Sequence, residues 1–198
     1  NSYPMNTNKT IRCSVAALVI ALLGLPNARA MMYYYDTYVI MDTGSGATWY
    51  DALSDGGDPN FNGATFSYNM LGGTLTLKGG EVKAYRDDGS NYWNGNNTQT
   101  VNYAVYTSGS SPSFSAFEIL AGGSGGTVNF EGGNNFGATN STGSVNLGSS
   151  ITSSGDNWRV AVYFSGNASY DSGGQQYFGM SPDGNGGANY VANVTAYY

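Results

Sequence analysis

Hydrophobic and polar residues alternate with a period of two along most of the chain after residue 30. This alternation is typical of β-strands that bury one face, and no stretch has the 3.6-residue spacing and caps of an amphipathic helix. Trp158, Val160, Val162 and Phe164 mark the clearest core strand. The alternating segments cover residues 33–41, 66–70, 74–78, 101–106, 158–164 and 190–198. The pattern predicts an all-β protein.

Short sequences rich in glycine, aspartate and asparagine separate these segments and predict turns. They lie at residues 55–59, 72–73, 79–80, 88–89, 132–135, 173–174 and 183–187. Short strands with this spacing predict one antiparallel β-sandwich, of jelly-roll or Ig-like type, over residues 31–198. Residues 121–157 carry few large apolar side chains, so they form either a long functional loop or additional edge strands.

The first thirty residues have the pattern of an export signal. Lys9 and Arg12 precede an apolar run at 15–23, and Ala28-Arg29-Ala30 fits a cleavage site. The run is too short for a membrane-spanning helix, which needs about 20 apolar residues. We therefore expect a signal peptide that starts at Met5 and is cleaved after residue 30, and a secreted or cell-surface protein with no membrane anchor.

Composition narrows the possible chemistry. The 198 residues contain no histidine, which excludes a Ser-His-Asp triad, a Cys-His pair and histidine-based metal sites. The single cysteine, Cys13, lies in the leader, so the mature chain has no disulfide. After cleavage four cations remain against thirteen carboxylates. This negative charge disfavours binding to nucleic acid and to anionic membranes.

Four segments resemble a β-rich module of large secreted and cell-surface bacterial proteins. They are FNGATF at 61–66, GTLTLKGGEVK at 73–83, NYAVYTSGSSPSF at 102–114 and NGGANYVANVT at 185–195. The resemblance spans nearly all of the mature chain. Since its motifs are turns and core strands, it implies a β-rich fold and export rather than an activity.

One short motif suggests enzymatic chemistry. Apolar residues precede Asp42-Thr43-Gly44-Ser45, and Trp49 follows, which resembles the signature of aspartic proteases. That reaction needs two carboxylates sharing a proton, so a single motif would require a dimer. The alternative is a strand that ends in an Asp-Thr-Gly-Ser turn. The glutamates Glu81, Glu118 and Glu131 show no fixed pair for glycoside hydrolysis, and Glu81 is predicted to lie at a solvated strand end.

Calcium is the only cofactor for which the chain offers a candidate site. Asp55, Asp58, Asn60 and Asn62 cluster around a glycine-rich turn and supply the oxygen ligands that Ca²⁺ prefers. The same residue types also stabilise turns by accepting hydrogen bonds from their own backbone.

A glycan site is predicted where aromatic and amide side chains adjoin. Asn91, Tyr92, Trp93 and Asn94 would provide ring faces flanked by hydrogen-bonding groups. The alternative is that these rings fill a core otherwise short of leucine and isoleucine.

The segment at residues 31–41 bears on assembly, because it is long, aromatic and nearly uncharged. Such a strand must be paired within its own domain or within a neighbouring subunit. In the second case Tyr33, Tyr35, Val39 and Met41 would share one face and fill the neighbour's groove.

These observations predict a non-catalytic structural or adhesive protein. We expect it to form a homopolymer, as the subunit of an extracellular filament or matrix. The alternatives are a carbohydrate-binding module for a polysaccharide and a dimeric aspartic protease with Asp42.

Overall fold

The computed structural model describes residues 32–53, 57–86, 98–120, 125–133, 135–166 and 189–198. The predicted leader lies outside these ranges. Within them, no helix is long and apolar enough to cross a membrane.

The described chain is all-β, as the alternation predicts. The first strands are β1 (Met32–Asp42), β2 (Ala47–Leu53), β3 (Thr65–Asn69), β4 (Thr76–Arg86), β5 (Gln99–Thr107) and β6 (Ser115–Leu120). They are followed by β7 (Thr127–Gly132), β8 (Asn135–Asn140), β9 (Val145–Asn146), β10 (Gly155–Gly166) and β11 (Tyr190–Tyr197). A short 3₁₀ turn, η1 (Gly148–Ser150), is the only helical element of the described residues.

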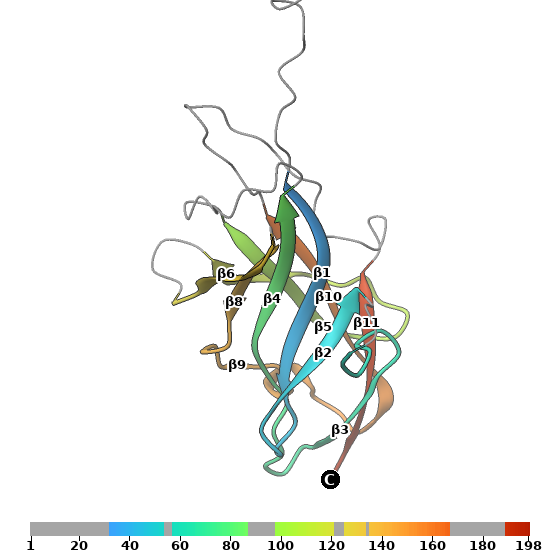
Figure 1. The fold of residues 1–198 in the computed structure, drawn as a ribbon. Coiled ribbons are helices and arrows are strands. Elements are labelled where there is room, and N and C mark those ends of the chain that lie inside the picture. The colour runs from blue at the N-terminus through green and yellow to red at the C-terminus, as the bar shows by residue number, and fades with distance from the viewer. Residues whose placement is uncertain (1–31, 54–56, 87–97, 121–124, 134, 167–188) are drawn as a thin grey trace, which may run out of the picture.

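The strands form two sheets. The first has the order β2-β1-β4-β8-β7, with β9 also paired to β4, and the second has the order β3-β11-β10-β5-β6. In the view of Figure 1, strands β1, β2 and β4 of the first sheet cross in front of β10, β5 and β11 of the second. One pairing departs from the predicted antiparallel arrangement, because β3 runs parallel to β11.

Both sheets contribute to one core of buried side chains. The first sheet supplies Val39, Met41, Leu77 and Val82, and the segment before β4 adds Leu75. From the second sheet come Phe66, Val101, Ile119, Trp158, Val160, Val162, Phe164, Ala192 and Val194. The alternating positions of residues 158–164 are therefore buried as predicted. Burying one large apolar side chain contributes about 1.5–3 kcal/mol, so this shared core is a major source of stability.

Residues 121–157 are built into the fold as additional strands where they are described. They provide β7 and β8, which form one side of the first sheet, and β9, which pairs with the start of β4. Of the two alternatives left open by the sequence, the structure supports additional strands.

The predicted turn at Gly79 and Gly80 is wrong, because both glycines lie inside β4. The pairing with β1 shifts register here, between Ile40 and Met41. A Cβ at Gly80 would lie 2.7 Å from the carbonyl oxygen of Tyr38. Glycines within a strand often mark such irregularities and close backbone approaches.

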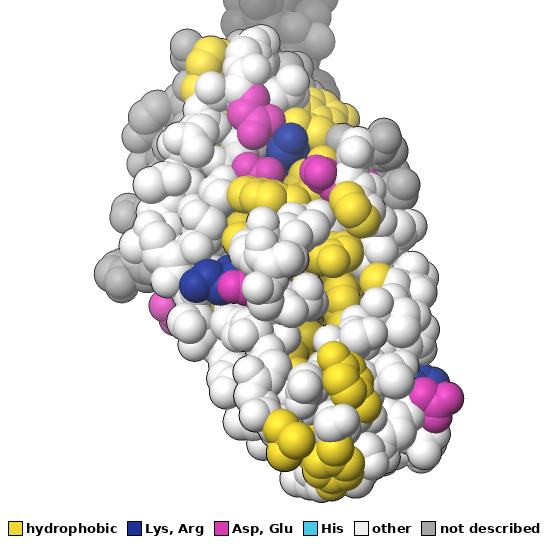
Figure 2. Space-filling view, turned by 90° about the horizontal axis from the view of Figure 1, so that it is seen from below, with side chains coloured by type: hydrophobic (Ala, Val, Ile, Leu, Met, Phe, Trp, Pro, Cys, Tyr) yellow, Lys and Arg dark blue, Asp and Glu magenta, His cyan; other side chains and the backbone are white. Residues whose placement is uncertain are grey.

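Hydrophobic side chains also reach the surface. Figure 2 shows them in a band along the face that it presents, where only a few charged side chains are visible. Among the described residues, the large apolar side chains with the greatest exposure are Leu71, Tyr85, Phe130, Tyr197 and Tyr198.

Candidate functional site

The bulge in β1 decides which side chains form the site. Val39 and Met41 point into the core between the sheets. Ahead of them, the register of β1 against β4 shifts between Tyr34 and Asp36. Consequently Tyr35 lies on the opposite, outer face of the sheet, where its hydroxyl reaches Glu131.

The prediction that Tyr33, Tyr35, Val39 and Met41 share one face is therefore wrong for Tyr35. An extra residue at a bulge changes the side to which the following side chains point. The side chain of Tyr33 lies outside the described part of the structure.

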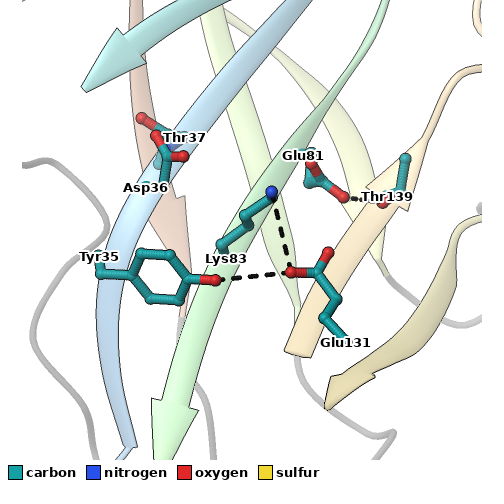
Figure 3. A network of polar contacts seen from close by, with 7 residues as sticks. All are labelled: Tyr35, Asp36, Thr37, Glu81, Lys83, Glu131 and Thr139. Carbon is teal, nitrogen blue, oxygen red and sulfur yellow. Dashed lines mark hydrogen bonds and ion pairs between the residues drawn. The ribbon is translucent and has the colours of Figure 1, made fainter. Parts of the chain in front are cut away.

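Six side chains from four strands gather on this outer face, and we call them the Glu81 cluster (Figure 3). Its members are Tyr35, Asp36, Glu81, Lys83, Glu131 and Thr139. The strands β1, β4, β8 and β7 are consecutive neighbours in the sheet, which is why residues so far apart in the sequence meet here.

Glu131 is the most exposed carboxylate of the cluster. The Lys83 Nζ atom lies 3.8 Å from its Oε2 atom. The Tyr35 hydroxyl donates a hydrogen bond of 3.5 Å to the same oxygen. Burial, followed by the negative charge of Glu131, raises the pKa of Tyr35 to about 12. This hydroxyl therefore remains a hydrogen-bond donor at neutral pH.

Glu81 is almost completely buried, with 9% of its surface exposed. The Thr139 hydroxyl donates a hydrogen bond of 2.6 Å to Glu81 Oε1. Burial raises the pKa of Glu81 above its ordinary value, and the charge of Glu131 adds to this. The Thr139 hydrogen bond and the Lys83 charge oppose the rise without cancelling it. The prediction of a solvated strand end is wrong, because Glu81 lies in the middle of a central strand.

The two glutamates converge on Gly137 of β8. A Cβ at this position would lie 2.6 Å from Glu131 Oε1 and 2.7 Å from Glu81 Oε1. Any larger residue would displace at least one carboxylate. Glycine thus allows two carboxyl groups, one buried and one open to solvent, to occupy the same stretch of the sheet.

Aromatic rings border the cluster. The rings of Tyr35 and Tyr85 lie 6.2 Å apart, and 36% of Tyr85 is exposed. The Lys83 ammonium lies 5.2 Å from the centre of the Tyr38 ring, which meets Trp49 edge-on. This face therefore combines ring surfaces with a carboxylate, an ammonium and a hydroxyl, which suits a ligand with both apolar ring faces and polar edges.

Asp42, the candidate protease residue, lies at the hairpin turn between β1 and β2. Its Oδ1 atom accepts hydrogen bonds from the backbone N–H groups of Gly44, at 2.8 Å, and Gly46, at 3.2 Å. This is the turn chemistry that the alternative interpretation predicts. Proteolytic activity of Asp42 stays a prediction.

We expect Asp42→Ala to lower the free energy of unfolding by about 1 kcal/mol, because the turn loses the acceptor of two hydrogen bonds. Asp42→Asn keeps a carbonyl oxygen at the same place and should leave stability nearly unchanged. Chemical denaturation of both variants measures this difference. Equal losses in the two variants would show that the turn does not depend on the Oδ1 acceptor. Protease activity at acidic pH that disappears in Asp42→Asn would instead support catalysis.

The described members of the predicted calcium cluster take part in turn and loop contacts. Asn60 Oδ1 accepts the N–H of Asn62, and Asn62 Oδ1 accepts the N–H of Val191 at the start of β11. Asp58 is exposed, and Asp55 lies outside the described residues. In the part of the chain that the structure describes, no three histidine, cysteine, aspartate or glutamate side chains gather as a metal site.

The predicted glycan residues Asn91, Tyr92, Trp93 and Asn94 lie outside the described residues. The sequence did not predict the Glu81 cluster, although Glu81 and Glu131 were each considered as carboxylates. The available signal was the pairing of Glu81 with Lys83 two residues later, since i and i+2 side chains share a face of a strand. The alternation in the sequence does not show which strands flank that face.

No protein-family model matches the chain, and no curated protein matches it with a significant score.

Proposed function

We propose that the chain is a secreted, non-catalytic protein that binds polysaccharide through the outer face of its first sheet. The observation that carries this proposal is the pair of partly exposed rings, Tyr35 and Tyr85, beside the Glu131–Lys83 ion pair. Aromatic faces can cover the apolar face of a sugar ring, while charged and hydroxyl groups bond its edges. Secretion rests on the predicted leader.

The proposal includes a finer description of the fold. We propose that the two sheets form a β-sandwich of jelly-roll or Ig-like type, in which the outer face of β1, β4, β8 and β7 is the binding surface. The core of buried side chains that both sheets share supports this description. A rigid sheet is suited to binding because its side chains are already held in place before the ligand arrives.

We expect Tyr85→Ala to weaken retention on the preferred polysaccharide by about tenfold, the effect of losing about 1.4 kcal/mol of ring contact. Glu131→Gln, which removes the negative charge that pairs with Lys83, should weaken it as well. Binding is measured by pull-down on cellulose, chitin and β-1,3-glucan and on a glycan array. Tyr197→Ala is the matched control, because Tyr197 is similarly exposed but lies on β11 of the other sheet.

Two results would contradict the proposal. The first is that the parent protein binds none of the polysaccharides or arrayed glycans. The second is that Tyr85→Ala and Tyr197→Ala bind equally well. Release of reducing sugar by the parent, lost in Glu131→Gln, would replace binding with hydrolysis. That reaction needs two carboxyl groups, and Glu81 and Glu131 would then be the candidates.

A second candidate is the subunit of a homopolymer that exchanges its N-terminal strand. The observation in its favour is that β2 covers only part of β1, with pairing that begins at Thr37 among the described residues. Against it, β1 lies between β2 and β4 of its own chain. Exchange would require these bonds to be replaced by those of a neighbour, and deletion of residues 31–37 tests this.

A further inference from the structure

The strand β7 is an edge of the first sheet. Among the described strands it pairs only with β8. Most of its side chains are exposed, while Val128 packs against the small core of Ala84, Phe136 and Ala138. An edge strand with so little burial opens more easily than the strands at the centre of a sheet. The polar contacts of Glu131 add to the backbone pairing with β8 and to the contact between the Phe130 and Phe136 rings.

Carboxyl groups outnumber ammonium groups around Glu131 of β7. Two carboxyl groups, Glu81 and Glu131, share the ammonium of Lys83, while the Asp36 carboxylate accepts the backbone N–H of Thr37. Lys83 lies 3.8 Å from Glu131, so it is already engaged. If Glu81 also ionises, a second negative charge lies next to Glu131 across Gly137. Glu81 is buried, so little water screens its charge.

We propose that the proton on Glu81 latches the edge strand β7 to the sheet. While Glu81 is neutral, Glu131 remains docked over Gly137 with Lys83 and Tyr35. When Glu81 ionises, it repels Glu131, and β7 detaches from β8 more often. The titratable groups closest to Glu81 are Lys83 on its own strand, Glu131 on β7, and Tyr35 and Tyr38 on β1. Asp36 of β1 lies opposite Lys83 in the register.

The direction of the pH effect follows from the raised pKa of Glu81. A carboxyl group that titrates higher in the folded state stabilises that state below its ordinary pKa of 4.5. This contribution is lost as the pH rises through the folded-state pKa. The latch is therefore closed in acid and loosens as the pH rises through the raised pKa of Glu81. The latch needs no ligand, so its test is independent of polysaccharide binding.

Hydrogen exchange of the full chain tests the latch. Protection of the amides in residues 127–140, corrected for the intrinsic pH dependence of exchange, should be higher at pH 5 than at pH 8. The ratio should grow about tenfold for each unit by which docked β7 raises the Glu81 pKa above its value in the sheet with β7 detached. Amides of β10 in the other sheet should show no such difference.

Two substitutions test the roles of the Glu81 and Glu131 carboxyl groups. Glu81→Gln imitates the neutral acid and still accepts the Thr139 hydroxyl, so protection at pH 8 should equal that at pH 5. Glu131→Gln removes the repelled charge from an exposed position and should also abolish the pH dependence. Glu118→Gln, on exposed β6, should behave as the parent. A parent without pH dependence, or either of the first two variants retaining it, would overturn the proposal.

Discussion

Gly79→Ala is expected to cost about 3 kcal/mol or more of folding free energy, enough to unfold much of a marginally stable domain. Two effects combine at this position. Gly79 has a φ of +151°, which side-chain-bearing residues rarely adopt. A Cβ would also overlap the backbone carbonyl of Asn140 on β8. Since the obstacle is backbone rather than a flexible side chain, β4 and β8 would have to separate.

Gly72→Ala is the matched control for this prediction. Gly72 has a similar φ of +138°, but no atom lies within 4 Å of the position of its Cβ. This variant carries the backbone strain alone, about 1–2 kcal/mol. Thermal and chemical denaturation should rank the parent first, Gly72→Ala second and Gly79→Ala last. If the two variants were equally stable, the close approach of β4 and β8 at Gly79 would be wrong.

Removal of residues 31–37 together with the leader is expected to abolish the folded state. These residues pair with the second half of β4, from Val82 to Arg86. They include Asp36 and Thr37, which are fully buried. Without them, β4 loses its hydrogen-bond partner over a stretch that carries the buried Val82. A chain that lacks only residues 1–30 is the control and should fold.

Circular dichroism and size-exclusion chromatography distinguish the outcomes of this truncation. We expect no cooperative thermal transition in the chain that lacks residues 1–37. A folded monomer that binds a synthetic peptide of residues 31–41 would instead support strand exchange between subunits. In that case the homopolymer would replace the binding protein as the better hypothesis.

Much of the core could be predicted from the sequence. Trp158, Val160, Val162 and Phe164 are buried as their alternation indicates, and so are Leu75 and Leu77. This success has a local cause: successive side chains of a strand point to opposite faces whatever its partners are. The Asp42 turn is equally local, because the carboxylate bonds backbone groups two and four residues away.

Such local patterns do not predict the Glu81 cluster. Alternation places Tyr35 with Val39, but the bulge against β4 turns its side chain to the outer face, toward Glu131. A bulge depends on the partner strand, and strand order is set by contacts between residues far apart in the sequence. Gly79 also depends on a partner strand. The adjacent glycines in the sequence suggest a turn, but in the structure Gly79 allows β4 to approach the backbone of Asn140 closely.

Glu81 shows most clearly which features follow from the sequence and which follow from the tertiary structure. Its sequence neighbours, two glycines and Lys83, indicate a solvated strand end. The sheet instead places it between β1 and β8, with Glu131 of β7 across Gly137, and thereby buries its carboxyl group. The sequence by itself determined that these residues form strands and which alternating side chains enter the core. Only the tertiary structure decided that Glu81 and Glu131 meet, because burial and charge proximity arise from strands that neighbour in space and not along the chain.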